Sequence, residues 1–242
     1  MLSDFNCKIL DIDRYKFYLG DESVFSIEAN KLADDINLLG NCGFHKLVHQ
    51  IKTDPTSPFY VYKKASSEII LHARASISHK LSGKFVIHTV PVLDLNEETP
   101  FIKDLEKFTA FKSNYIFFEL PYTDELHDQL FVSINHLLYK RHLFPIFTDI
   151  QKHLDTYSKI DINRIINIKN AAFQFTLNSV ALAKNINIIK HILNNGGLVL
   201  LGTSCEHSDL NRSEIGKCLK YLKKQLGDDE YMKLIIRSRS LL

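Results

Sequence analysis

The stretch 194-NNGGLVLLG-202 decides the fold class of this chain. Its glycine pair, Gly196-Gly197, ends a helical pattern over Ser179–Asn194, and the apolar run Leu198–Gly202 follows at once. A glycine that ends a helix just before a strand is typical of the αβ loops of α/β proteins. A short, continuous run of Leu and Val indicates a strand covered on both faces, as the strands of parallel sheets are.

The same alternation extends outward through the chain. Further apolar runs predict strands at Phe5–Leu10, Phe44–His49, Ile69–Ala73, Phe85–Val92, Asn114–Glu119, Phe144–Thr148 and Ala171–Leu177. Amphipathic segments predict helices at Ser26–Leu39, Thr99–Phe111, Asp124–Tyr139, Asp161–Lys169, Ser179–Asn194 and Ser213–Leu226. The segment Thr53–Ser67 contains Pro55 and Pro58, which favours a loop. Repeated β-then-α units imply a parallel sheet, so the fold class is α/β.

Length and composition are typical of one globular domain. The chain has 242 residues, which suits a single domain over 1–242 and a barrel close to the TIM type, which uses about 250 residues. A doubly wound open sheet is the alternative, because periodicity does not distinguish it from a barrel. The net charge of +2 gives no reason to expect a nucleic-acid partner.

The sequence also gives an expectation for the compartment. The amino-terminal residues, MLSDFNCKIL, contain neither a basic region nor a long apolar run, so we expect no signal peptide. No apolar stretch has the length of a membrane span, and we expect no membrane insertion. The four cysteines lack CxxC spacing, which favours reduced thiols and a cytoplasmic protein.

Chemistry in parallel α/β folds gathers where strands end, and the segments there share a pattern. Six of them, in collinear order, resemble one family: Asp4–Leu10, Gly43–Lys52, Tyr115–Leu120, Pro145–Lys152, Phe173–Asn178 and Leu201–His207. The family is the PHP (polymerase and histidinol phosphatase) superfamily, and within it the tyrosine phosphatases of capsule and exopolysaccharide operons. The resemblance implies a distorted TIM-like (β/α)7 PHP barrel. It also implies a manganese cofactor and a setting in which active relatives dephosphorylate a tyrosine kinase of polysaccharide synthesis.

The residues at the family's metal-binding positions depart from its pattern. The matching positions here are Asn6, Lys8, Lys52, Arg74 (or Ala75), Asp149, Ser204 and Glu206. A further acidic ligand in the family's first loop has no counterpart, because the alignment places an insertion at Asp11–Ser23. Manganese sites use imidazole and carboxylate ligands, whereas Lys offers only donors and a positive charge. We therefore expect no bound metal, no acidified water and a catalytically inactive binding or regulatory protein.

The substitutions also suggest how the former site is filled. Lys8, Lys52 and Arg74 would replace the charge of the metals by pairing with Asp149 and Glu206. A ligand bound at this site would contact side chains from the same strand ends: Lys152, His207 and Arg212. The expected partner is a tyrosine kinase, or its phosphorylated tail, in polysaccharide synthesis.

Several other functions stay open. A metal-dependent tyrosine phosphatase or phosphoesterase with a rearranged manganese site is the main alternative, and His207 is its best single ligand. A relocated site would recruit some of five other histidines: His45, His49, His72, His79 and His88. Cysteine catalysis is disfavoured, because neither Cys7 nor Cys205 is followed by the C-x5-R pattern that would cradle a phosphate. A purely structural subunit is the last alternative.

Overall fold

A seven-stranded parallel sheet forms the centre of the molecule. The computed structural model describes residues 11–15, 33–34, 36–37, 46–56, 59–77, 86–110, 113–123, 125–202 and 212–240. The strands are β1 (Asp11–Tyr15), β2 (Lys46–Lys52), β3 (Val86–Asp94), β4 (Tyr115–Glu119), β5 (Phe144–Phe147), β6 (Ala172–Thr176) and β7 (Leu198–Gly202). They are ordered β1 to β7 across the sheet, and every neighbouring pair is parallel.

The sheet curls into a distorted TIM-like barrel. Strands β1 and β7, at opposite ends of the strand order, contact each other. The amide of Gln50 on β2 donates a hydrogen bond of 2.6 Å to Gln174 on β6, which spans the interior. Residues two apart on a strand share a face, and the inward faces meet in a small buried cluster of Val48, Val90, Val92, Phe117, Ile146, Ala172 and Leu200, which Ala110 joins from the segment before β4. The predicted α/β barrel is therefore confirmed.

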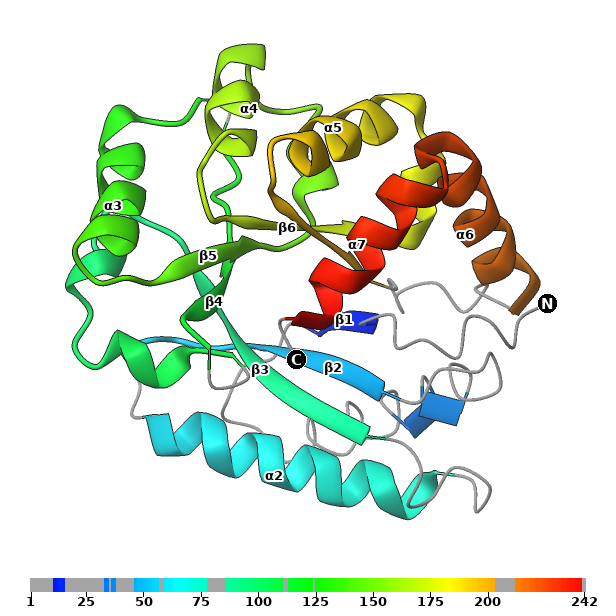
Figure 1. Ribbon diagram of the computed structural model, residues 1–242. Coiled ribbons are helices and arrows are strands. Elements are labelled where there is room, and N and C mark those ends of the chain that lie inside the picture. The colour runs from blue at the N-terminus through cyan, green and yellow to red at the C-terminus, as the bar shows by residue number, and fades with distance from the viewer. Residues whose placement is uncertain are drawn as a thin grey trace.

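Helices cover the outside of this barrel (Figure 1). They are α2 (Phe59–Ser76), α3 (Asp128–Tyr139), α4 (Lys159–Ile166), α5 (Ala183–Asn194), α6 (Arg212–Leu226) and α7 (Asp228–Ser240). A larger apolar cluster lies between the strands and these helices, and includes Phe118, Phe147 and Phe173 from the outward strand faces. The helices thus bury the side of the sheet that faces away from the interior.

The strand predicted at Ile69–Ala73 is wrong, and so is the loop predicted over most of Thr53–Ser67. Helix α2 occupies Phe59–Ser76 instead. Tyr62, Ala65, Ile69 and Ala73 are buried at helical spacing, whereas Leu71 is 69% exposed. A short apolar run does not separate a strand from a helix, and the buried residues follow the helical period here.

The first strand also differs from its prediction. Its predicted range, Phe5–Leu10, lies outside the described residues, whereas β1 comprises Asp11–Tyr15 and pairs with β2 through Asp13↔His49. The interpretation of Asp11–Ser23 as an insertion is therefore wrong for its first five residues. The alignment to the family motif, and not a turn signal in the chain, produced that error.

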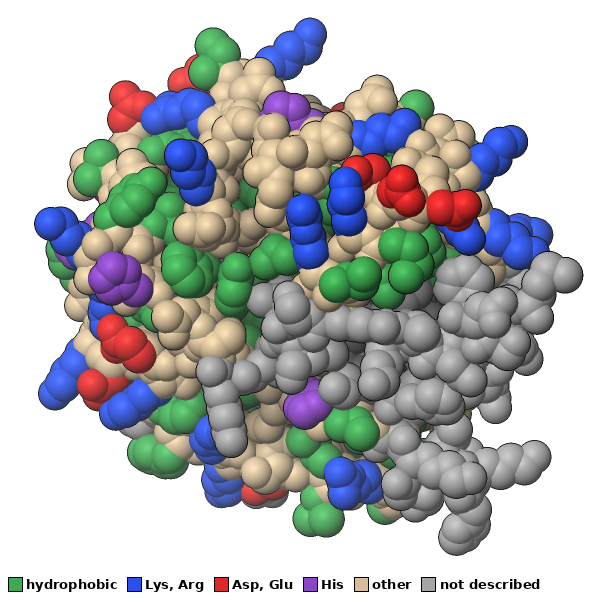
Figure 2. Space-filling model, in the orientation of Figure 1, with side chains coloured by type: hydrophobic (Ala, Val, Ile, Leu, Met, Phe, Trp, Pro, Cys, Tyr) green, Lys and Arg blue, Asp and Glu red, His purple; other side chains and the backbone are tan. Residues whose placement is uncertain are grey.

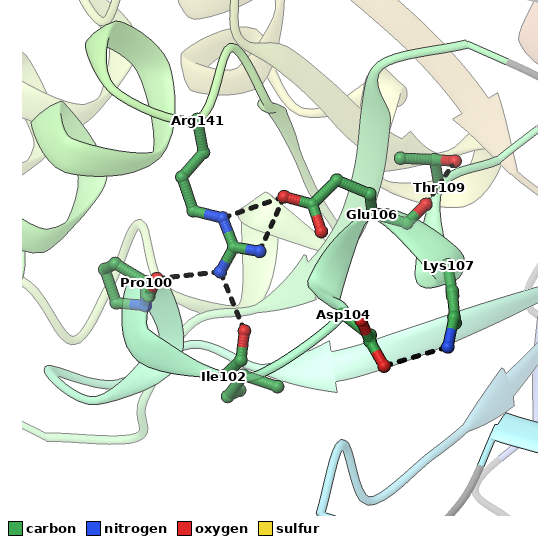
Figure 3. Close-up of polar contacts among 7 residues, drawn as sticks. All are labelled: Pro100, Ile102, Asp104, Glu106, Lys107, Thr109 and Arg141. Carbon is green, nitrogen blue, oxygen red and sulfur yellow. Dashed lines mark hydrogen bonds and ion pairs between the residues drawn. The ribbon is translucent and has the colours of Figure 1, made fainter.

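The helix predicted at Thr99–Phe111 is replaced by two 3-10 turns, η2 (Thr99–Phe101) and η3 (Leu105–Phe108). The side chain of Arg141, just after α3, holds them (Figure 3). Its guanidinium donates to the carbonyls of Pro100 at 2.9 Å and Ile102 at 2.7 Å, and to Glu106 Oε1 at 3.0 and 2.6 Å. The turns thus have side-chain donors for carbonyls that a continuous helix would have used internally.

Most of the helix predicted at Ser26–Leu39 lies outside the described residues, whereas the four helices predicted from Asp124 onward are confirmed with shifted starts. Helix α3 begins at Asp128, and α5 follows a 3-10 turn, η5 (Leu177–Ala181). Helix α4 begins at Lys159, because Ser158 accepts a hydrogen bond from the backbone of Asp161 and caps it. Helix α7 was not predicted. Gly227, with φ of +82°, separates it from α6, and acidic residues fill its first turn.

The described surface carries charges of both signs. On the face shown in Figure 2, basic and acidic side chains are interspersed, as expected from a net charge of +2. None of the helices in the described part of the chain is both long enough and apolar enough to cross a membrane.

Candidate functional site at the barrel mouth

Three charged residues meet where β2, β3 and β4 end. Lys52 is the last residue of β2, Asp94 of β3 and Glu119 of β4. The ladder pairs Asp94 directly with Glu119, and Lys52 with Val92, two residues before Asp94. Because the strands are parallel, their carboxyl ends meet at one edge, and the three side chains point to the same mouth of the barrel.

The Lys52 ammonium bridges the two carboxylates. Its Nζ atom lies 2.6 Å from Asp94 Oδ1 and 2.9 Å from Glu119 Oε2. The side chain of Glu119 is 2% exposed, that of Lys52 is 30% exposed and that of Asp94 is 61% exposed. Burial opposes the charge on Lys52, but hydrogen bonds and charges from Asp94 and Glu119 outweigh it, so the pKa of the ammonium is raised. The two carboxylates therefore favour the charged form of Lys52.

Asp149 lies at the same end of the barrel, two residues after the last residue of β5. It adopts a left-handed conformation with φ of +46°, which Asp tolerates better than most residues, and its side chain is buried. Lys152 Nζ lies 3.1 Å from Asp149 Oδ2. The turn after β5 thus brings Asp149 and Lys152 together as an ion pair within one short loop.

The predicted pairing of lysines with carboxylates is partly wrong. Lys52 does pair with acidic side chains at the mouth, but these are Asp94 and Glu119, and Asp149 pairs with Lys152. Arg74 is not at the mouth, because it is an exposed residue in the last turn of α2. Arg74 was expected at the mouth because Ile69–Ala73 was predicted to be a strand, whereas this segment is part of α2.

Five other predicted site residues lie outside the described part of the chain: Asn6, Lys8, Ser204, Glu206 and His207. Arg212 begins α6, and only its backbone is described. Three of the alternative metal ligands are described, and one of them, His88, is half-buried on β3. His72 is exposed on α2, and His49 is buried, which lowers the pKa of its imidazole to about 3. The roles proposed for the undescribed residues stay predictions.

Sequence reasoning missed Asp94 and the interior amides. Asp94 ends an apolar run, Val-Pro-Val-Leu-Asp, and a carboxylate at such a strand end is a usable signal. Gln50 and Gln174 each appeared within a motif, but only the register shows that they meet across the barrel. Sequence spacing did not contain that information, because the two residues are more than a hundred positions apart.

The described mouth residues do not fit a manganese ion. Carboxylates of Asp94 and Glu119 are suitable ligands, yet an ammonium lies against both of them. Among the described residues, no group of three His, Cys, Asp or Glu side chains is arranged to hold a metal. An ammonium at that distance from the carboxylates would repel a divalent cation.

Comparison with known proteins relates the fold to one class of enzyme. No family model matches the sequence, and no curated protein matches it. The structure is similar to crystal structures of YwqE from Bacillus subtilis and CpsB from Streptococcus pneumoniae, described as metal-dependent tyrosine phosphatases. The TM-score is 0.62 at 13% identity, over 90% of this chain and 87% of the other.

A second similar structure is an adenine deaminase from Arthrobacter aurescens. Its TM-score is 0.43 at 11% identity, over 90% of this chain and 74% of the other, which is too weak to support an inference. The first similarity establishes the fold, a TIM-like barrel of the kind found in those phosphatases. At 13% identity it does not extend to their activity.

Proposed function

We propose that this chain is a non-catalytic barrel of the tyrosine phosphatase fold, which binds a partner or ligand without hydrolysing it. The observation that carries the proposal is the Lys52 ammonium between Asp94 and Glu119. A metal-dependent phosphatase needs a cation there that acidifies water and neutralises phosphoryl oxygens. An ammonium supplies positive charge but has no open coordination position for water.

The proposed setting is polysaccharide synthesis, on the basis of the family resemblance. The partner would be a tyrosine kinase of that process, or its phosphorylated tail, and the protein would compete with an active phosphatase for it. A direct test is a pull-down with tail peptides in phosphorylated and unphosphorylated forms. Selective retention of the phosphorylated peptide is the expected result, and equal retention of both would contradict it.

Metal content and activity test the non-catalytic proposal. The protein is purified with excess manganese, gel-filtered and analysed for metal, and its activity is measured on p-nitrophenyl phosphate and a phosphotyrosyl peptide. We expect well under one metal per chain and turnover at the background rate. Stoichiometric, tightly held manganese together with manganese-dependent turnover would overturn the proposal.

The main alternative is a metal-dependent phosphatase with a rearranged site. The similarity of the fold to metal-dependent tyrosine phosphatases supports it. In that case, activity should be lost on substitution of His207 and of Asp149, whereas a binding protein has no activity for those substitutions to remove.

A further inference from the structure

A cavity of about 720 Å³ lies beside the barrel mouth and plays no part in the site described above. It opens between the β2–α2 loop with the first two turns of α2 on one side and the segment Ile102–Phe108 on the other. Its lining residues are Pro55, Thr56, Phe59, Tyr60, Lys63, Ile102, Lys103, Asp104, Lys107 and Phe108. The volume is within the range of about 300–1,000 Å³ of sites that bind small molecules.

The walls of this cavity are aromatic. Phe59 and Phe108 pack edge to face with ring centroids 5.1 Å apart, and Phe108 is buried. Tyr60, a large side chain near the start of α2, is 70% exposed at the opening. Rings in this arrangement offer a flat ligand both an apolar floor and an exposed face to stack on.

The rim of the cavity is basic. Three of its ionisable residues are lysines and one is an aspartate, Asp104, which is already paired with Lys107 at 2.8 Å. In the part of the chain that the structure describes, no carboxylate lies within ion-pair distance of Lys63 or Lys103. The first turn of α2 also faces the cavity and carries no acidic residue, so the positive end of the helix adds to the same field.

One wall is fixed in advance of any ligand. The Arg141 guanidinium holds the carbonyl of Ile102 and the carboxylate of Glu106, which flank Lys103 in the chain (Figure 3). The Asp104–Lys107 pair holds the next turn in the same view. A wall held by these contacts gives up little conformational freedom when a ligand binds, which favours affinity.

We propose that this cavity is a binding site for a phosphate monoester that carries an aromatic ring. The ring would pack against Phe59 and Tyr60, and the phosphate would lie between Lys63 and Lys103. The proposal does not depend on the barrel mouth and holds whether or not the mouth is catalytic. A phosphotyrosine side chain and a nucleoside monophosphate are two sources of this chemistry.

Calorimetric titration with benzylphosphonate tests the site, because a phosphonate is not hydrolysed and so no activity is needed. We expect saturable binding to the full-length protein and none of benzyltrimethylammonium, which has the ring but the opposite charge. Lys103→Glu should weaken binding about tenfold or more, since it replaces an attraction with a repulsion worth at least ~1.4 kcal/mol. Lys64→Glu is the matched control, because Lys64 is exposed on α2 next to Lys63 but does not line the cavity.

Tyr60→Ala tests the aromatic wall, with the exposed Tyr139→Ala as its control. Separate titrations with a phosphotyrosyl peptide and a nucleoside monophosphate identify the source, and binding of either one at the Lys103-dependent site supports the proposal. Circular dichroism confirms that each variant is folded. Absence of saturable binding, equal weakening by Lys64→Glu and Lys103→Glu, or inorganic phosphate binding as tightly as benzylphosphonate would overturn it.

Discussion

Replacing Lys52 with Met should destabilise the protein by ~2 kcal/mol at pH 7. Met keeps most of the length of the side chain and removes only the ammonium, which leaves the carboxylate of Glu119 without its nearby cation. Removal of one partner from a fully buried pair costs about 3–5 kcal/mol, and from an exposed pair ~0–1 kcal/mol. Glu119 is 2% exposed but Asp94 is 61% exposed, so the cost should lie between those limits and arise mainly from Glu119.

Urea unfolding measures this loss, which corresponds to a decrease of about 4–8 °C in Tm for a chain of this size. Lys64→Met is the matched control and should cost less than ~0.5 kcal/mol, since Lys64 lies 3.9 Å from Glu68 on an exposed helix face. The double variant Lys52→Met/Glu119→Gln should recover part of the loss, because it removes the negative charge that the Lys52 ammonium balances.

The pH dependence provides a second check. The folded-state pKa of Lys52 is raised above its unfolded value, so the charged ammonium stabilises the fold below pH ~10.4 and that stabilisation is lost as the pH rises through the folded pKa. The difference between the wild type and Lys52→Met should therefore hold from pH 7 to 9 and shrink above that. A loss no larger than that of Lys64→Met, or one unchanged at high pH, would refute the reasoning.

Three further predictions concern polar side chains. Gln50→Leu or Gln174→Leu should each cost ~1–3 kcal/mol by removing the hydrogen bond between the two buried amides, whereas the double variant should cost less than the sum, measured by urea unfolding. Burial lowers the pKa of His49 to about 3, so below pH ~6.5 the unfolded chain binds a proton that the folded protein excludes. The free energy of unfolding should therefore fall by up to ~1.4 kcal/mol per pH unit between pH ~6.5 and pH 3. His49→Gln should reduce this dependence on pH. Ser158→Ala removes the cap of α4 and should lower stability by ~1 kcal/mol, and a change below ~0.3 kcal/mol would contradict the assigned cap.

The parts of the fold that local sequence determines were predicted well. Strand β7 has the predicted bounds, Leu198–Gly202, because Gly196 adopts a positive φ of 80° and stops the helix before an apolar run. The length of the apolar run and the glycine that ends the preceding helix were sufficient to predict this strand. At Ile69–Ala73 the apolar run had no such boundary, and the helical burial pattern around it was spread over 18 residues.

The candidate site was less predictable, because it depends on register. Lys52 was recognised as a changed position, yet its partners are Asp94 and Glu119, which come from two other strands. Strand register decides which residues lie opposite one another in a sheet, and no local sequence pattern encodes the register. Family alignment also assigned Asp11–Ser23 to an insertion, whereas β1 lies at Asp11–Tyr15.

The order of the strands has a consequence for how the protein is made. Each strand from β2 onward pairs with the strand that precedes it in the chain, so every ladder can form as soon as the later strand has left the ribosome. In the part of the chain that the structure describes, the contact between β1 and β7 joins the beginning of the sheet to its end. Synthesis at about 5–20 residues per second would therefore lay down the sheet strand by strand, and closure of the barrel would wait for the last one. Until then the open edges of the growing sheet are exposed to other chains, and the step that removes this hazard is the final one.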